Sequence, residues 1–375
     1  MVYTNSIPNS VSILVRSMNQ LTIDEKHSLK QNCENAIRII EPDFDEQDFD
    51  HNKVNWDHPI WGLIGSTPGI LMLGELGESL QNLRNMENFS IIVERLKNPR
   101  EFNGAYNELQ IGNNLFKYGI SFKINSQLQT KKSPDFVIDF EGREINLEIT
   151  EKEKSQEWRR AERNAGRIKD YLFKGFASGK YVYSLSIQRP LSDKRTEKIF
   201  EQCQLMEENV QNSGLEEYHI PDVIDLYIYK PECIDKVPGE SRRIFCTMPR
   251  IDEVARIKAK INKKSSQLDN TRPGILLILD NYSWLFNLGQ KVDVNLKMKV
   301  GEFICDFENI SALILQNNYF IANNHQEEFI IEEKNCIFRQ AYNPKTLFTT
   351  NKLILLNEYT KNPIQKNEIE LLKRI

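Results

Sequence analysis

The segment PDFVIDFEGREINLEIT, residues 134–150, decides how the rest of the sequence is interpreted. Residues 134–140 and 143–150 each alternate apolar with polar side chains, which is typical of β-strands with one buried face. Only Glu141 and Gly142 separate them, a spacing that favours a tight hairpin turn. The segment therefore predicts two neighbouring antiparallel strands.

The sequence on both sides of this hairpin predicts an α/β fold. Residues 102–118 place Phe102, Ala105 and Leu109 on one stripe of a helix that ends at Gly119, and residues 120–127 alternate as another strand. Helical and strand patterns then follow one another along the chain, as in α/β proteins. The further helices are predicted at 155–173, 193–211 and 251–268, and the further strands at 181–188, 222–229, 275–280, 310–316, 327–333 and 335–342.

Three regions are expected along the chain. Residues 1–98 are mostly helical in pattern, and Thr22 followed by Glu25 forms a capping-box signature. Residues 99–345 form the α/β domain, with an insertion near 175–245. Residues 346–375 are interpreted as a C-terminal extension.

The composition is that of an ordinary folded protein: of the 375 residues, 40% are hydrophobic and 27% charged. The longest apolar run, 275–279, is far shorter than the roughly 18 residues of a membrane-spanning helix, so no membrane association is expected. The first ten residues have no signal-peptide pattern, and we expect a cytoplasmic protein. Because the net charge is −4, a nucleic-acid site must be local rather than a property of the whole surface.

Three acidic residues, Glu108, Asp135 and Glu148, form the most informative set. Strand alternation places Asp135 on the side away from Phe136, and Glu148 on the side away from Leu147. A tight hairpin brings both carboxylates to one side, where they repel each other unless a divalent cation lies between them. Oxygen ligands favour Mg²⁺ or Mn²⁺, and such a cation supports hydrolysis of phosphodiester bonds.

The order of these residues resembles the PD-(D/E)XK, or restriction-endonuclease-like, nuclease superfamily. The matching features are Glu108 on a helix, Pro134-Asp135 at a strand start, and Glu148-Ile149-Thr150 after the hairpin. The resemblance implies an αβββαβ core with a mixed sheet flanked by helices. It also implies an Mg²⁺-dependent enzyme in which Asp135 and Glu148 bind the metal ion and Glu108 completes or supports the site. Domains of this kind often act in bacterial defence.

The superfamily has a lysine two positions after its second acid, and this sequence has Thr150 there. Threonine has no positive charge with which to position a hydroxide. Two lysines are candidate substitutes. Lys152 shares the strand face of Glu148, and Lys264 lies on a predicted helix where Lys260, Lys264 and Gln267 follow the i, i+4, i+7 spacing of one face. The sequence does not choose between Lys152 and Lys264.

Two basic segments are candidates for contact with a nucleic acid backbone. Residues 152–174 are basic but interleaved with glutamates, so a solvated helix face is an equal alternative there. Residues 256–264 contain five basic residues and no acid, and are the better candidate. The proposed nucleic-acid-binding residues are Arg159, Arg163, Lys260, Lys264 and Gln267.

The sequence therefore favours a metal-dependent nuclease, with DNA preferred over RNA as the substrate. One alternative is a non-catalytic member that kept the fold and binds nucleic acid. Another is an assembly subunit whose helical N-terminal region binds a second copy or a partner protein. Thr150 is the feature that separates an active enzyme from these alternatives.

Overall fold

The structure is a computed structural model of the chain. It describes residues 7–41, 58–64, 66–125, 133–152, 156–177, 181–237, 244–246, 253–280, 294–320, 329–333, 335–343 and 348–375. The chain divides into two compact units. Met1–Lys152 and Glu253–Ile375 form the first unit, and Glu153–Asp252 forms the second.

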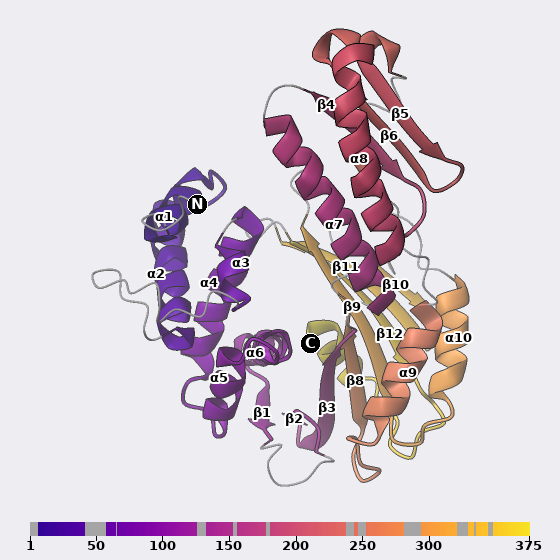
Figure 1. Cartoon of the computed structure of the whole chain (residues 1–375). Helices are drawn as coiled ribbons and strands as arrows, with labels where there is room; N and C mark the ends of the chain where they lie inside the picture. Colours follow the sequence, from indigo (N-terminus) through magenta and orange to yellow (C-terminus); the bar gives the residue numbers. More distant parts are fainter. Residues whose placement is uncertain are drawn as a thin grey trace. The chain divides into compact units, whose positions relative to one another are not determined.

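The first unit contains a mixed sheet of eight strands (Figure 1). Its strand order is β1-β2-β3-β8-β9-β12-β11-β10. The pairs β3–β8 and β8–β9 are parallel, and the other neighbours are antiparallel. The strands are β1 (Ser121–Ile124), β2 (Phe136–Phe140), β3 (Arg143–Glu151), β8 (Gly274–Leu279), β9 (Ala312–Phe320), β10 (Phe329–Glu333), β11 (Cys336–Asn343) and β12 (Phe348–Leu356).

Helices cover both faces of this sheet. One apolar core joins one face to the N-terminal helices and α11, and a second joins the other face to α9 and α10. The helices are α1 (Ile7–Ser17), α2 (Ile23–Ile40), α3 (Ile60–Leu63), α4 (Thr67–Leu83), α5 (Phe89–Lys97), α6 (Phe102–Lys117), α9 (Glu253–Ser265), α10 (Val294–Ile304) and α11 (Glu368–Arg374). No helix in the described part of the chain is long and apolar enough to cross a membrane.

The predicted hairpin is confirmed. Strands β2 and β3 pair antiparallel, with Phe136 opposite Leu147 and Ile138 opposite Ile145. Glu141 and Gly142 have φ values of 52° and 82°, the left-handed values that a two-residue hairpin turn needs. The apolar pairs face the core beneath α6, so the alternate residues of β3, including Glu148, face α9.

The second unit has its own sheet, with strand order β5-β6-β4-β7. Helices α7 and α8 cover one face of it, and their apolar residues form a separate core with the strands. The elements are α7 (Gln156–Ala177), β4 (Val182–Ile187), α8 (Asp193–Ser213), β5 (Leu215–Ile220), β6 (Ile224–Tyr229), the 3₁₀-helix η1 (Pro231–Lys236) and β7 (Ile244–Cys246).

The structure corrects the predicted regions. Residues 346–375 are not an extension, because β12 lies inside the large sheet between β9 and β11. Residues 1–98 do not form a separate unit, because their helices share one apolar core with the sheet. The insertion is wider than 175–245, since Glu153–Asp252 is a separate unit and its described residues have their own apolar core.

The predicted α/β class and the main strands are confirmed, and the structure adds β5, β7, β12 and α10. The ends of four predicted elements, residues 126–127, 155, 251–252 and 327–328, lie outside the described residues.

Candidate functional site

The hairpin and α6 bring the three predicted acids together. Asp135 directly precedes β2, and its Oδ2 accepts a hydrogen bond of 2.7 Å from the backbone N–H of Ile149 on β3. Because Phe136 pairs with Leu147, continuing this register places Asp135 beside Glu148. Glu108, Asp135 and Glu148 are 6%, 3% and 0% exposed. The structure thus holds the predicted set in a buried position.

Burial and mutual repulsion change the acidity of the two glutamates. Burial, followed by the charge of Asp135, raises the pKa of Glu148 to about 9. The same two causes, in the same order, raise the pKa of Glu108 to about 7. Both glutamates therefore respond to Asp135, which is the shared member of the set. The Oε2 atom of Glu148 is buried and has no hydrogen-bond partner among the described residues.

Arg95 on α5 holds Glu108 in a two-pronged ion pair. Its Nη1 donates to Glu108 Oε2 over 2.6 Å, and its Nη2 donates to Oε1 over 2.8 Å. Burial acts to lower the pKa of Arg95, but the hydrogen bonds and charge of Glu108, with a contribution from Asp135, raise it overall. Sequence reasoning missed Arg95, since no local pattern links it to Glu108. Both carboxylate oxygens of Glu108 accept hydrogen bonds from Arg95. This geometry favours Glu108 as a support for the site rather than as a metal ligand.

Lys264 meets Glu148 directly. Its Nζ donates to Glu148 Oε1 over 2.6 Å from the end of α9. The Lys264 side chain is 22% exposed and that of Glu148 is 0% exposed, so the lysine is the solvent-accessible partner of the pair. Thr150, at the position of the motif lysine, is buried. Helix α9 therefore places Lys264 beside Glu148, whose own strand has Thr150 at the position of the superfamily's lysine.

Lys152, the other candidate, pairs with a different acid. Its side chain lies on the same face as Glu148, as predicted, but its Nζ donates a hydrogen bond of 2.7 Å to Asp280 Oδ2. The two side chains are 3% and 1% exposed. The Lys152 N–H also donates to the Leu279 carbonyl, which fixes the chain beside the end of β8. Sequence reasoning missed Asp280, whose position after the apolar run 275–279 was the available signal.

The predicted basic face of α9 is shorter than expected. Lys260 and Lys264 both lie on α9, but the helix ends at Ser265, so Gln267 is not on this face. Instead the Gln267 N–H donates to the Lys264 carbonyl in the turn that follows. Asn309 ends the helix there, because its Nδ2 donates to the carbonyls of Ser265 and Leu268.

The other two predicted nucleic-acid-binding residues belong to the second unit. Arg159 and Arg163 lie on α7 and are exposed. Arg163 donates over 3.3 Å to Asp193 at the start of α8, and Asn164 donates to the same carboxylate. With Arg160, these contacts lower the pKa of Asp193 to about 2, led by the hydrogen bond from Asn164. Arg163 therefore has a role in joining the two helices, and nucleic-acid binding by either arginine stays a prediction.

The residues present fit a two-carboxylate metal site. Among the described residues, no group of three or more histidine, cysteine or acidic side chains has the arrangement of a metal site. However, Mg²⁺ commonly uses only one or two protein carboxylates and keeps several waters. Asp135 and Glu148 supply two such groups, and the buried Oε2 of Glu148 is an acceptor that lacks a protein donor among the described residues. Glu108, engaged by Arg95, is not needed as a ligand.

Comparison with known proteins identifies no family for this chain. No model of a known protein family matches the sequence, and no curated protein matches it significantly. The site is therefore interpreted from its own geometry.

Proposed function

We propose that this protein is a metal-dependent nuclease that hydrolyses phosphodiester bonds, with DNA favoured over RNA, on a restriction-endonuclease-like core. The order of elements supports the fold part of the proposal. Helix α6 is followed by β1, β2 and β3, and then, after the second unit, by α9 and β8. These strands are neighbours in the order β1-β2-β3-β8, with β8 parallel to β3, so the chain has an αβββαβ succession with a mixed sheet.

The contact between Lys264 and Glu148 is the observation that carries the proposal. A nuclease centre needs acids that hold a cation and a positive group near the reacting phosphate. Asp135 and Glu148 are the acids, and Lys264 lies 2.6 Å from Glu148 on the side with access to solvent. A lysine at the end of α9 thus replaces the lysine that Thr150 does not provide.

Each residue of the centre has a distinct part. Asp135 and Glu148 would hold the metal ion, and the backbone N–H of Ile149 keeps the Asp135 carboxylate in place. When bound, the metal ion would lower the pKa of a water molecule and offset the negative charge that develops on the phosphate. Lys264 is placed to contact the phosphate or the attacking water, and Arg95 keeps Glu108 oriented beside the acids. Lys260, four residues before Lys264 on the same helix, extends the basic surface toward the nucleic acid backbone.

The proposal is tested by incubating the purified full chain with supercoiled plasmid, single-stranded DNA and single-stranded RNA, with Mg²⁺ or Mn²⁺. We expect cleavage with either metal ion that stops when a chelator is added and returns when the metal ion is restored. We also expect faster cleavage of DNA than of RNA. Cleavage that persists in the chelator, or a preparation that cleaves none of the three substrates, would contradict the proposal.

A second candidate is a nucleic-acid-binding or assembly subunit without catalysis. The observation that favours it is that protein cations already neutralise two of the acids, since Arg95 pairs with Glu108 and Lys264 with Glu148. In that case the chain binds nucleic acid without cleaving it, and its affinity falls steeply as salt rises. In either case we propose bacterial defence as the setting, and the N-terminal helices as the surface for a partner protein or a second copy.

A further inference from the structure

The face of the large sheet beneath α6 changes from apolar to polar in a single step. One row across five paired strands is Ile149, Leu277, Ile314, Ile354 and Ile337, and all five side chains are buried in one apolar core. The next row on the same face, two residues along each strand, is Glu151, Leu279, Gln316, Lys352 and Arg339. Gln316 and Lys352 in this row are buried, and buried polar groups need partners, so the row requires an explanation that packing does not give.

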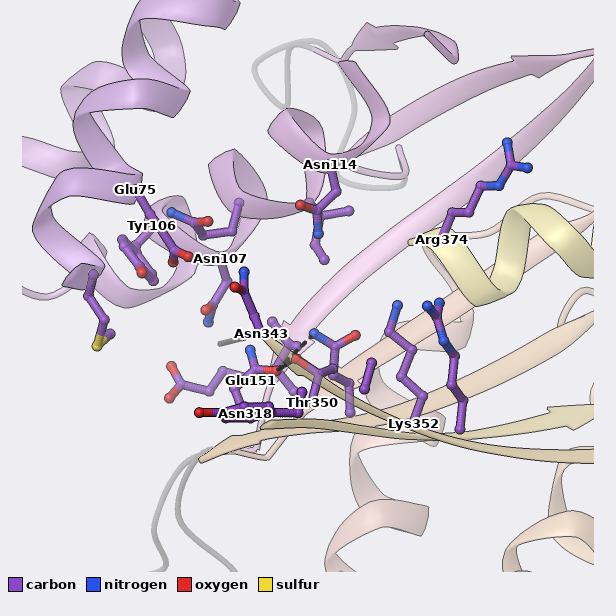
Figure 2. Close-up of a pocket in the computed structure, with 18 of the residues that line it drawn as sticks. Glu75, Tyr106, Asn107, Asn114, Glu151, Asn318, Asn343, Thr350, Lys352 and Arg374 are labelled. Atoms are coloured by element: carbon purple, nitrogen blue, oxygen red, sulfur yellow. Dashed lines mark hydrogen bonds between the residues drawn. The ribbon is translucent and has the colours of Figure 1, made fainter. Parts of the chain in front are cut away.

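This polar row forms part of the floor of a cavity of about 550 Å³ (Figure 2). Helix α6 supplies a wall with four amide side chains that follow helical spacing: Asn103, Asn107, Gln110 and Asn114. Figure 2 shows Asn107 and Asn114 reaching from α6 toward Asn343 and Thr350 on the strands. The cavity has the size of a small-molecule site and lies wholly within the first unit.

Several polar atoms at the cavity have no hydrogen-bond partner among the described residues. They are Nδ2 of Asn107, Nε2 of Gln110 and Oε1 of Gln316. Asn107 and Gln316 are 7% and 5% exposed, so solvent does not readily satisfy them. Two of these atoms are donors and one is an acceptor, a mixture that suits a molecule with both kinds of group, such as a base or a sugar.

The strands that form the floor of the cavity carry two cationic side chains at one end. Lys352 and Arg339 are paired residues on neighbouring antiparallel strands and point to the same face. Both donate to the backbone carbonyl of Lys373, which is a neutral acceptor. Burial, and then the charge of Arg339, lowers the pKa of Lys352 to about 7. Figure 2 shows Lys352 on the side of the cavity away from Glu75 and Tyr106.

We propose that this cavity binds a small organic phosphate, with the phosphate at Lys352 and Arg339 and the polar body against the amides of α6. Two adjacent cations match a doubly charged phosphate better than a singly charged carboxylate, and an arginine suits phosphate geometry. The amide groups then supply the donors and acceptors that a sugar or a base uses. The site is separate from the candidate nuclease centre, because Glu148 lies on the opposite face of β3 from Glu151.

The test is isothermal titration calorimetry on the full chain in a chelator, so that no metal-bound site contributes. The probes are AMP, ribose 5-phosphate, adenosine and citrate. We expect AMP or ribose 5-phosphate to bind with a Kd of about 1 mM or tighter, and adenosine and citrate to bind at least about tenfold more weakly. Lys352→Met is expected to weaken binding of the phosphate probe by about tenfold or more.

Matched variants show whether a change in phosphate binding is specific to the cavity. Lys123→Met makes the same exchange at an exposed position on β1 and should leave binding unchanged. Asp135→Ala, in the candidate nuclease centre, should also bind normally, so this proposal can fail or succeed separately from the nuclease proposal. Asn107→Leu tests the amide wall without changing charge and should weaken AMP binding. The proposal is wrong if neither phosphate binds below about 10 mM, if citrate binds as well as they do, or if folded Lys352→Met and Asn107→Leu both bind normally.

Discussion

Two lysine–carboxylate pairs, Lys152–Asp280 and Lys264–Glu148, lie on the face of β3 that bears Glu148. The two pairs have nearly equal N–O distances but differ in exposure to solvent. Lys152 and Asp280 are 2.7 Å apart with side chains 3% and 1% exposed. Lys264 and Glu148 are 2.6 Å apart, but the lysine is 22% exposed. A closed pair holds the structure together, because neither partner can be removed without leaving a buried charge. A lysine at the solvent boundary can also contact a substrate, so under the proposed function we expect Lys264 rather than Lys152 to act in catalysis.

The largest expected effect comes from Asp135, the acid that raises the pKa of both Glu108 and Glu148. We expect Asp135→Ala to reduce metal-dependent cleavage by about 10⁴-fold or more, because it removes a metal ligand. The fold should persist by circular dichroism, since the variant loses the hydrogen bond from the Ile149 N–H but also relieves the repulsion that Asp135 exerts on Glu148 and Glu108. Asp139→Ala, four residues along the chain on β2 and exposed, is the control and should cleave normally. Equal cleavage by the two variants would reject the assigned site.

Lys152→Met tests the closed pair. We expect a loss of about 3–5 kcal/mol in the free energy of unfolding, because the buried Asp280 carboxylate loses the positive charge of Lys152. The double variant Lys152→Met/Asp280→Leu should recover most of this loss. Chemical denaturation measures both, and cleavage per folded molecule should stay near the wild-type rate. If Lys152→Met kept its stability but lost cleavage, Lys152 rather than Lys264 would be the lysine that acts in cleavage.

Lys264→Met tests the open pair. We expect cleavage to fall by about 100-fold, as for the loss of one electrostatic contact to the transition state. Lys263→Met on the same helix is the matched control, because Lys263 is the exposed neighbour of Lys264. Initial rates on plasmid at saturating Mg²⁺ give the comparison. If Lys264→Met cleaves at the wild-type rate while Lys152→Met stays active too, the metal ion alone activates the water.

Lys352, which is buried, gives the smallest expected effect, and the direction of its dependence on pH can be checked. The pKa of Lys352 is lowered to about 7 by burial and by Arg339, so between pH 7 and 10 the unfolded state binds more protons at this residue than the folded state does. Its contribution to stability therefore rises with pH across this range. Relative to wild type, Lys352→Met should be more stable at pH 6 than at pH 9 by about 2 kcal/mol.

Denaturation of both proteins at the two pH values measures this difference. Because the variant is compared with wild type at each pH, contributions from the other groups that line the cavity largely cancel. A difference that does not change with pH would show that Lys352 titrates at its ordinary pKa in the folded protein.

The sequence predicts what depends on neighbours along the chain. The hairpin followed from alternation and a two-residue turn, and the same alternation placed Asp135 and Glu148 on one side. The capping box at Thr22 and Glu25 is present as predicted. These features are local, so the pattern of one short segment contains them.

The remainder depends on packing between distant segments. Lys264 reaches Glu148 only because α9 covers the face of β3 that bears this acid, and Lys152 meets Asp280 only because β8 pairs with β3. Strand β12 was missed because its first half is polar, which suits the row beneath the cavity and not a uniformly apolar face. Gln267 was misplaced because Asn309, far along the chain, ends α9 two residues earlier.

The most direct test of the central claim is Mn²⁺ binding to the full chain, measured by titration calorimetry in the absence of nucleic acid. If Asp135 and Glu148 form a metal site, wild type binds about one Mn²⁺ per chain, Asp135→Ala loses this binding, and Asp139→Ala retains it. Wild type that binds no Mn²⁺, or an Asp135→Ala variant that binds it as wild type does, would contradict the claim.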